Sequence, residues 1–192
     1  MTSAPPQTIA CGPRQVFHLY TDASHETNFS GIGAECYDAT GTELWHFGDS
    51  LDSNQIDRLN PDEKGTIISE LEAVAVYAGV DRIASEHKHL DVICFIDNDS
   101  VLASMIKAGS PNDIMENAAS LVASLEVSHD IRLWFERVPS YSNPSDGPSR
   151  GSFFGFDRSN RVDVCSESML CRLTSMGEDA TMWSTNPRFP IG

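Results

Sequence analysis

Residues 16–24 read VFHLYTDAS, and the rest of the chain is organised around this stretch. It is apolar and aromatic until Thr21, and it then presents one acid, Asp22, followed by two small residues. Valine, phenylalanine, leucine and tyrosine suit a pleated, covered surface, so the stretch predicts a strand. A carboxylate on a central strand is costly unless a hydrogen bond, a cation or a bound metal compensates it. The partner of Asp22 is therefore the first question that the sequence raises.

The segments that follow predict an α/β fold. Strand-like runs at 31–38 and 43–51 are separated by turn formers, which favours three antiparallel strands joined by hairpins. A helix is expected over 66–84, and short β-branched or aromatic runs at 91–97 and 131–138 predict two parallel strands with helices over 98–108 and 113–126 between them. We therefore expect a five-stranded mixed sheet, three antiparallel strands and then two parallel ones, flanked by helices.

The length and composition predict one domain with extensions. A chain of 192 residues with 40% hydrophobic content and a mean hydropathy of -0.25 can bury a substantial core. We expect a flexible arm over 1–14, the domain over 15–151 and an extension of unknown role over 152–192, and we expect residues from Arg14 to Gly151 to fold alone. No apolar run approaches the roughly 20 residues of a membrane helix, and no signal peptide is evident. The five scattered cysteines suggest free thiols, with Cys36 and Cys94 buried in strands, so an intracellular location, cytoplasmic or nuclear, is expected.

The net charge argues against general affinity for nucleic acid. Twenty-eight acids stand against 13 lysines and arginines, which gives a net charge of -15 and a pI of about 4.6. Such a field repels phosphate backbones. A nucleic-acid function would therefore have to rest on a local site and on metal ions.

Four acids occupy positions that a fold of this kind can bring together. Asp22 ends the apolar run of the first strand, Glu70 lies near the start of the main helix, Asp97 closes the fourth strand, and Asp146 follows the fifth. Taken singly, each has a structural explanation as a hairpin, helix-dipole or capping residue. Four carboxylates at one sheet edge cannot stay close and ionised without cations. Divalent ions with oxygen ligands are the natural answer, and two of them form a clamp for phosphoryl displacement.

The segments YTDAS, SELEAVAV, FIDNDSV and NPSDGPSRG resemble, in this order, the ribonuclease H domain that accompanies retroelement reverse transcriptases. The resemblance covers residues 16–151, and the closing N-P-x-D-x-x-S-R pattern is its most specific part. It implies the ribonuclease H fold and hydrolysis of the RNA strand of an RNA–DNA hybrid with two Mg²⁺ ions, for which Mn²⁺ may substitute. Asp22, Glu70, Asp97 and Asp146 fall on the four metal-binding carboxylates of that family. The implied partners are the hybrid and a fused or associated reverse transcriptase, and no membrane.

Two departures from the family pattern bear on substrate affinity. The loop over 139–145 contains none of the histidines that many members carry before the last acid. The connection between the fourth and fifth strands is short, and Lys107 is its only base where many cellular members have a basic protrusion. We therefore expect weak intrinsic binding of the hybrid, with a shallow dependence on salt.

Residues beside the four acids also need assignments. Glu72 stands two positions from Glu70 and points to a different helix face, and the family spacing to Leu71 and Ala73 favours Glu70. Asp99 is expected to cap a helix, while Trp45 and Trp134 are expected in the core. The candidate substrate contacts are Ser24, His25, Asn28, Asn98 and Arg150.

Two other functions remain open on the sequence alone. A nuclease or recombinase of the same fold could act on DNA, because fold does not determine substrate. A non-catalytic domain could instead position a neighbouring polymerase. The retention of all four carboxylates favours a working site over this second alternative.

Overall fold

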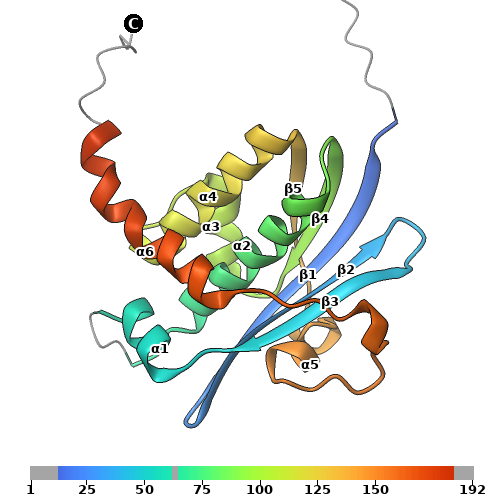
Figure 1. The fold of residues 1–192 in the computed structure, drawn as a ribbon, viewed down its shortest axis with the longest axis horizontal. Helices are drawn as coiled ribbons and strands as arrows, with labels where there is room; N and C mark the ends of the chain where they lie inside the picture. Colours follow the sequence, from blue (N-terminus) through green and yellow to red (C-terminus); the bar gives the residue numbers. More distant parts are fainter. Residues whose placement is uncertain (1–12, 62–64, 184–192) are drawn as a thin grey trace, which may run out of the picture.

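The computed structural model describes residues 13–61 and 65–183, with side chains as far as Ser175, so most of the expected N-terminal arm lies outside the described residues. Five strands form one sheet in the order β3-β2-β1-β4-β5 (Figure 1). They are β1 (Gln15–Glu26), β2 (Phe29–Asp38), β3 (Glu43–Ser50), β4 (Leu90–Ile96) and β5 (Ile131–Arg137). β1, β2 and β3 pair antiparallel, while β4 and β5 run parallel to β1. The expected mixed sheet is confirmed.

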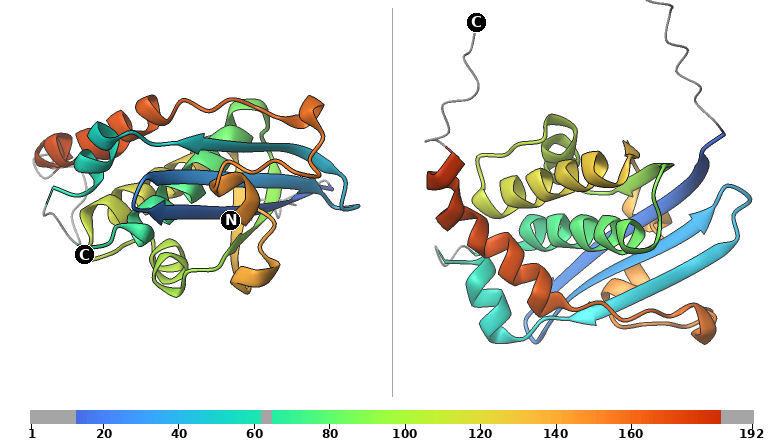
Figure 2. Two further views of the ribbon diagram at one scale, coloured as in Figure 1. Left: turned by 90° about the horizontal axis from the view of Figure 1, so that it is seen from below. Right: turned by 45° about the horizontal axis from the view of Figure 1, so that its top comes forward.

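Helices cover one face of this sheet, and α2 (Ile68–Glu86) lies at the centre of them (Figure 2). α2 packs against β1 and β2, and α4 (Asp113–His129) packs against α2. The remaining helices are α1 (Ser53–Leu59), α3 (Asp99–Lys107), α5 (Asp146–Ser149) and α6 (Ser166–Trp183), with short 3-10 turns at η1 (Ser140–Ser142) and η2 (Arg158–Asn160). Among the described residues, no helix combines the length and the apolar character needed to cross a membrane.

The core lies between α2 and alternate residues of the central strands. Leu19 on β1 is fully buried and reaches the helix at Gly79, where a Cβ would meet its methyl groups. Cys36 and Cys94 are buried free thiols in this layer, as predicted. Because side chains alternate along a strand, the even-numbered residues of β1 point to the opposite face of the sheet.

Two local expectations are corrected, and one short helix is added to those expected. The cap of α3 is Asn98, whose side chain accepts from the N–H groups of Ser100 and Val101, so Asp99 is the first helical residue and not the cap. Trp45 is in the core, but Trp134 is 68% exposed, because it stands on the strand face that α4 does not cover. The polar segment after β3 contains a complete short helix, α1, which Asp52 begins with a reciprocal side-chain cap from Gln55.

The segment after residue 151 packs on the domain instead of leaving it. Its residue Arg161 forms a parallel β-bridge with His46 of β3, and the rings of Phe153 and Phe156 lie against the His46 ring. It then forms α6, which contacts α1, α2 and α4. Met169, Leu170 and Leu173 of α6 are buried in the same core as the sheet. The burial of these α6 side chains argues against the expectation that residues from Arg14 to Gly151 fold alone, and truncation at Gly151 tests it.

Candidate active site

Asp22 and Asp97 are brought together by the parallel pairing of β1 and β4. This pairing ends with Tyr20 opposite Phe95; Asp22 lies two residues further along β1, and Asp97 directly follows the last residue of β4. Asp22 is only 6% exposed. The Coulombic repulsion of Asp97 acts on Asp22, which places the two carboxylates within electrostatic reach of each other.

The acid of α2 that faces these aspartates is Glu72. Its carboxylate is 8% exposed and feels the charges of Asp97 and Asp22. Glu70 is also buried, but its carboxylate accepts a hydrogen bond of 2.7 Å from Asn112 Nδ2 at the start of α4. Residues two positions apart on a helix, such as Glu70 and Glu72, are separated by about 200° around the helix axis, so their side chains cannot point in one direction. The family spacing indicated Glu70, whereas the contacts described here join Glu72 to the aspartates, so Glu72 enters the proposal below as the helix acid.

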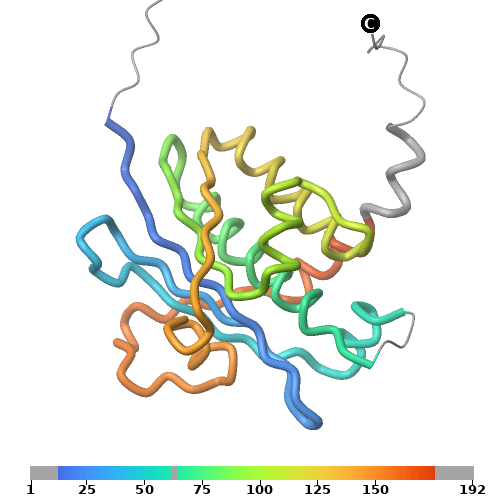
Figure 3. The backbone as a smooth tube through the Cα atoms, turned by 180° about the vertical axis from the view of Figure 1, so that it is seen from behind, coloured from blue at the N-terminus to red at the C-terminus, as the bar shows by residue number. Residues whose placement is uncertain are grey.

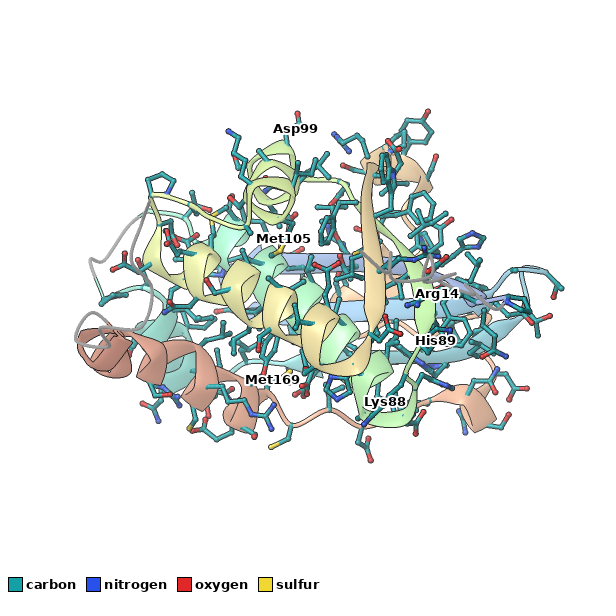
Figure 4. The ribbon with its side chains drawn as sticks, turned by 90° about the horizontal axis from the view of Figure 1, so that it is seen from above. Arg14, Lys88, His89, Asp99, Met105 and Met169 are labelled. Carbon is teal, nitrogen blue, oxygen red and sulfur yellow. The ribbon has the colours of Figure 1, made fainter. Side chains whose placement is uncertain are left out.

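Asn98 fixes the direction of the Glu72 side chain. While its Oδ1 caps α3, its Nδ2 donates to Glu72 Oε1 at 3.2 Å and to Ser69 Oγ at 3.1 Å. Figure 4 shows Asp99 at the start of α3, at the opposite end of β4 from His89. The carboxyl end of β4, the start of α3 and the first turns of α2 thus meet at one point.

Asp146 arrives from the other face of the sheet on α5. This four-residue helix packs on β1, β2 and β3 (Figure 3). Ser149 of α5 is buried, and its hydroxyl donates to Asp22 Oδ2 at 2.5 Å and to the carbonyl of Asp146 at 3.0 Å. The Asp146 side chain is 54% exposed and accepts from Arg150 Nε at 2.9 Å. The charge of Asp146 raises the pKa of Asp22, so it belongs to the same electrostatic cluster.

Glycines on β2 and β3 let α5 approach the sheet. A Cβ on Gly33 would overlap the backbone of Ser149 and Pro148, and a Cβ on Gly48 would overlap the carbonyl of Pro148. Gly33 is the direct pairing partner of Asp22. The close contact therefore sets the depth at which Ser149 meets Asp22.

Burial and mutual repulsion raise the pKa values of two of these carboxyls. Burial raises the pKa of Asp22 to about 6, with repulsion by Asp97 and Asp146 adding to it and the Ser149 hydrogen bond opposing it. Burial likewise raises the pKa of Glu72 to about 8, and Asp97 and Asp22 add to the shift. Ionising all of these groups together requires positive charge that the nearby side chains do not supply in full.

The cluster presents oxygen atoms that fit a divalent cation. Glu72 Oε2 and Asp97 Oδ1 are buried and have no hydrogen-bond partner among the residues that the structure describes. Unpaired buried carboxylate oxygens are costly, and hard cations bind such oxygens. In the conformation described for residues 13–61 and 65–183, no three His, Cys, Asp or Glu side chains have the spacing of a closed metal site. A cation bound here would therefore be held by carboxylates that lie near one another without the close spacing of a closed metal site.

The candidate substrate contacts differ in burial and in their hydrogen-bond partners. Ser24 is buried and donates to the carbonyl of Ser149 at 2.7 Å, which makes it part of the α5 contact. His25 lies 2.8 Å from the Ser30 hydroxyl, and Asn28 is exposed at the hairpin tip. Arg150 pairs with Asp146 and with Glu26 at 2.6 Å. His25, Asn28 and Arg150 are thus the exposed members of the five candidates.

Sequence reasoning did not find two of the residues that position the cluster. Ser149 donates to Asp22, and Asn143 Nδ2 donates to the carbonyl of Thr21 at 2.8 Å, so both tie the segment of Asp146 to β1. Both lie inside the N-P-S-D-G-P-S-R pattern, which carries the only sequence signal for them.

Comparison with known proteins identifies the fold. No protein-family model matches the chain, and no curated protein matches it. RNase H1 from the halophilic archaeon Halobacterium salinarum is 18% identical with a TM-score of 0.56, covering 69% of this chain and 93% of its own. The N-terminal RNase H domain of a Mycobacterium tuberculosis protein is 15% identical with a TM-score of 0.58, covering 72% and 93%. LC11-RNase H1 in complex with an RNA/DNA hybrid is 15% identical with a TM-score of 0.59, covering 71% and 95%.

The likeness to these structures, together with the strand order of this chain, shows that its fold is ribonuclease H-like. Each of them covers about 70% of this chain and nearly all of its own length. At such low identity the likeness concerns the fold, and the function has to be argued from the site.

Proposed function

We propose that this protein is a metal-dependent endonuclease that hydrolyses the RNA strand of RNA–DNA hybrids. The observation that carries the proposal is the gathering of Asp22, Asp97 and Glu72, with two buried carboxylate oxygens that lack partners. The solved RNase H1 neighbours and the order of the four sequence motifs support the same activity.

The residues of the chain would hold two Mg²⁺ ions through Asp22, Asp97, Glu72 and Asp146. When bound, such ions activate a water molecule and neutralise charge that develops on the phosphate and on the leaving oxygen. Ser149 would hold one oxygen of Asp22 so that the other stays available, and Asn98 would do the same for Glu72. Asp146 would contribute from the exposed side of the cluster, where its side chain is paired with Arg150.

The proposal extends to the setting of the reaction. The N-P-S-D-G-P-S-R pattern is the feature that favours a retroelement enzyme acting beside a reverse transcriptase. The cations nearest the site are already paired: Arg150 with Asp146 and Glu26, and Arg137 with Asp99. A basic polymerase partner would hold the hybrid at high effective concentration, which this acidic chain does poorly alone.

The experiment is a comparison of labelled substrates with the full chain. RNA–DNA hybrid, double-stranded RNA and double-stranded DNA are each incubated with Mg²⁺, with Mn²⁺ and with a chelator. Cleavage confined to the RNA strand of the hybrid, lost with the chelator and restored by either ion, is the expected result. Asp97→Asn should abolish it while the protein stays folded, because the change removes a repelling charge.

Two outcomes would change the assignment. Cleavage of DNA in place of the hybrid would favour a DNA nuclease or recombinase of the same fold. Cleavage by Asp97→Asn at the normal rate would mean that the activity does not come from this carboxylate cluster.

A further inference from the structure

One face of the sheet carries aromatic rings that no helix covers. Helix α5 and residues 153–156 lie over β2 and β3 on this face, opposite α2. On the other strands the register aligns residues into rows across the sheet. One row joins Trp134, Ile93, His18 and Tyr37, and the next joins Glu136, Phe95, Tyr20 and Glu35. Asp22 lies two residues beyond Tyr20, and Asp97 lies two residues beyond Phe95, so the aromatic rows lead toward the carboxylate cluster.

The rings of these rows are already ordered against one another. Tyr20 and Phe95 stack with ring centroids 4.5 Å apart and planes 11° from parallel. Tyr37 meets Tyr20 edge-on at 5.9 Å, and His18 meets Phe95 edge-on at 6.1 Å. These four rings are half-buried, and Trp134 is 68% exposed beside them. We call these five residues the aromatic platform.

The aromatic platform borders a hollow of suitable size for a planar group. The hollow has a volume of about 330 Å³ and is lined by His18, Tyr20, Tyr37, Gly41, Ser142 and Pro144. Ligand sites are commonly hollows of a few hundred Å³ lined by rings and a few polar groups. Here the Ser142 hydroxyl and the His18 ring supply the polar groups.

We propose that the aromatic platform binds unpaired bases of the RNA strand where it leaves the hybrid. The inference rests on the proposed function and adds a second contact to it. The short distance between the rings and the carboxylates supports an RNA strand as the ligand. Two residues, about 7 Å of extended chain, separate Tyr20 from Asp22 and Phe95 from Asp97. A strand held at the carboxylates can therefore continue onto the rings.

Charge favours stacking over phosphate contacts at this surface. The arginines at its edge form ion pairs, Arg132 with Asp91 and Arg137 with Asp99. In a chain of net charge -15, affinity for a nucleic acid must come from interactions that do not depend on phosphate attraction. Aromatic rings stack on any base and tolerate sequence changes, and they bind single strands because paired bases hide their faces.

The test compares hybrids with and without a single-stranded RNA extension. Binding of the full chain to labelled hybrid is measured by fluorescence anisotropy in Ca²⁺, which is used to prevent cleavage. We expect the extension to tighten binding about tenfold, as stacking of a base on an aromatic ring typically does. The gain should persist at high salt, because the stacked bases add no phosphate contacts.

Variants of the aromatic platform should remove this gain. Trp134→Leu and Phe95→Leu keep an apolar side chain but lose the ring, so the extended and blunt hybrids should then bind with similar affinity. Trp134→Phe keeps a ring and should retain the gain. Phe154→Ala is the matched control, because Phe154 is an exposed ring on the C-terminal segment, 98% accessible and outside the platform.

Three results would overturn the inference. An extension that adds no affinity in the unmodified protein would exclude stacking at this surface. Equal gains in Trp134→Leu, Phe95→Leu and Phe154→Ala would place any stacking elsewhere. Loss of self-association or of polymerase binding by these variants, with the RNA gain intact, would make the surface a protein interface. Cleavage of the blunt hybrid is scored separately in Mg²⁺, so failure of the nuclease proposal is distinguishable from failure of this one.

Discussion

At the scale of the residue, the candidate site is governed by carboxylates that cannot all be charged at low cost. Asp22 and Glu72 have pKa values raised to about 6 and about 8, chiefly by burial. A carboxyl whose pKa is higher in the folded than in the unfolded state stabilises the fold below its unfolded pKa. That contribution is lost as the pH rises through the folded pKa. In the metal-free protein these two groups therefore favour folding at mildly acidic pH.

We predict that the metal-free protein unfolds at a higher temperature at pH 5.5 than at pH 8.5. Glu72→Gln should raise the unfolding temperature at pH 8.5, by on the order of 1 kcal/mol in stability, and should flatten the pH dependence. Thermal unfolding followed by circular dichroism in a chelator measures both effects. Part of the dependence of unfolding temperature on pH should remain in Glu72→Gln, because burial also raises the pKa of Glu35 to about 7. A metal-free protein that lost stability steadily from pH 8.5 to pH 5.5 would contradict these shifts.

The sequence could not distinguish Glu70 from Glu72 by hydropathy. Both acids lie on a helix that is buried on most faces, so the neighbours of each are apolar. The spacing to Leu71 and Ala73 favoured Glu70, but the direction of a helical side chain depends on how the helix is rotated against the sheet. That rotation is set by tertiary contacts, including the packing of Gly79 on Leu19, which the sequence does not reveal.

At the scale of the element, α5 can approach the sheet closely because the strand residues that face it are glycines. We predict that Gly33→Ala displaces α5, lowers stability by about 1–3 kcal/mol and strongly reduces activity, since a Cβ would overlap the Ser149 backbone. Denaturant unfolding and hybrid cleavage measure the two effects. Gly65→Ala is the control, because a Cβ there meets no atom within 4 Å. Normal activity in Gly33→Ala would show that the position of α5 does not matter to the site.

The strands and main helices were predictable because their patterns are strong. An apolar and aromatic run identified β1, a short β-branched run identified β4, and the long apolar run identified α2. The exposed Trp134 was not predicted, because alternation alone does not say which face of an edge strand lacks a covering helix. α1 is short and polar, and its cap at Asp52 is visible only when Gln55 is recognised as the reciprocal partner.

At the scale of the whole molecule, α6 completes the core. Leu170 and Leu173 are fully buried, although the sequence around them is polar. We predict that Leu173→Ala lowers the free energy of unfolding by about 2–5 kcal/mol, and that a chain ending at Gly151 unfolds or aggregates. Val127→Ala is the control, because Val127 is 86% exposed. A truncated chain with unchanged stability would mean that residues 15–151 are a complete domain.

The charge of the whole molecule sets how it meets a hybrid. With a net charge of -15 and its site arginines already paired, the chain should bind a blunt hybrid weakly, with an affinity that falls only slightly as salt rises. A titration of affinity against salt in Ca²⁺ measures the slope. Tight binding whose affinity falls steeply with salt would show that the protein surface contacts many phosphates and needs no basic partner.

The central claim is that Glu72, with Asp22 and Asp97, forms a metal-dependent catalytic centre. The most direct test is the Mg²⁺-dependent rate of hybrid cleavage by Glu72→Gln beside that of Glu70→Gln. Loss of residues that merely support metal ligands costs 10–100-fold in many enzymes, so Glu72→Gln should slow cleavage by more than about a hundredfold. Glu70→Gln should stay within about threefold of the unmodified protein, since its partner Asn112 can hydrogen-bond an amide as well. The reverse order, with Glu70→Gln inactive and Glu72→Gln active, would contradict the claim.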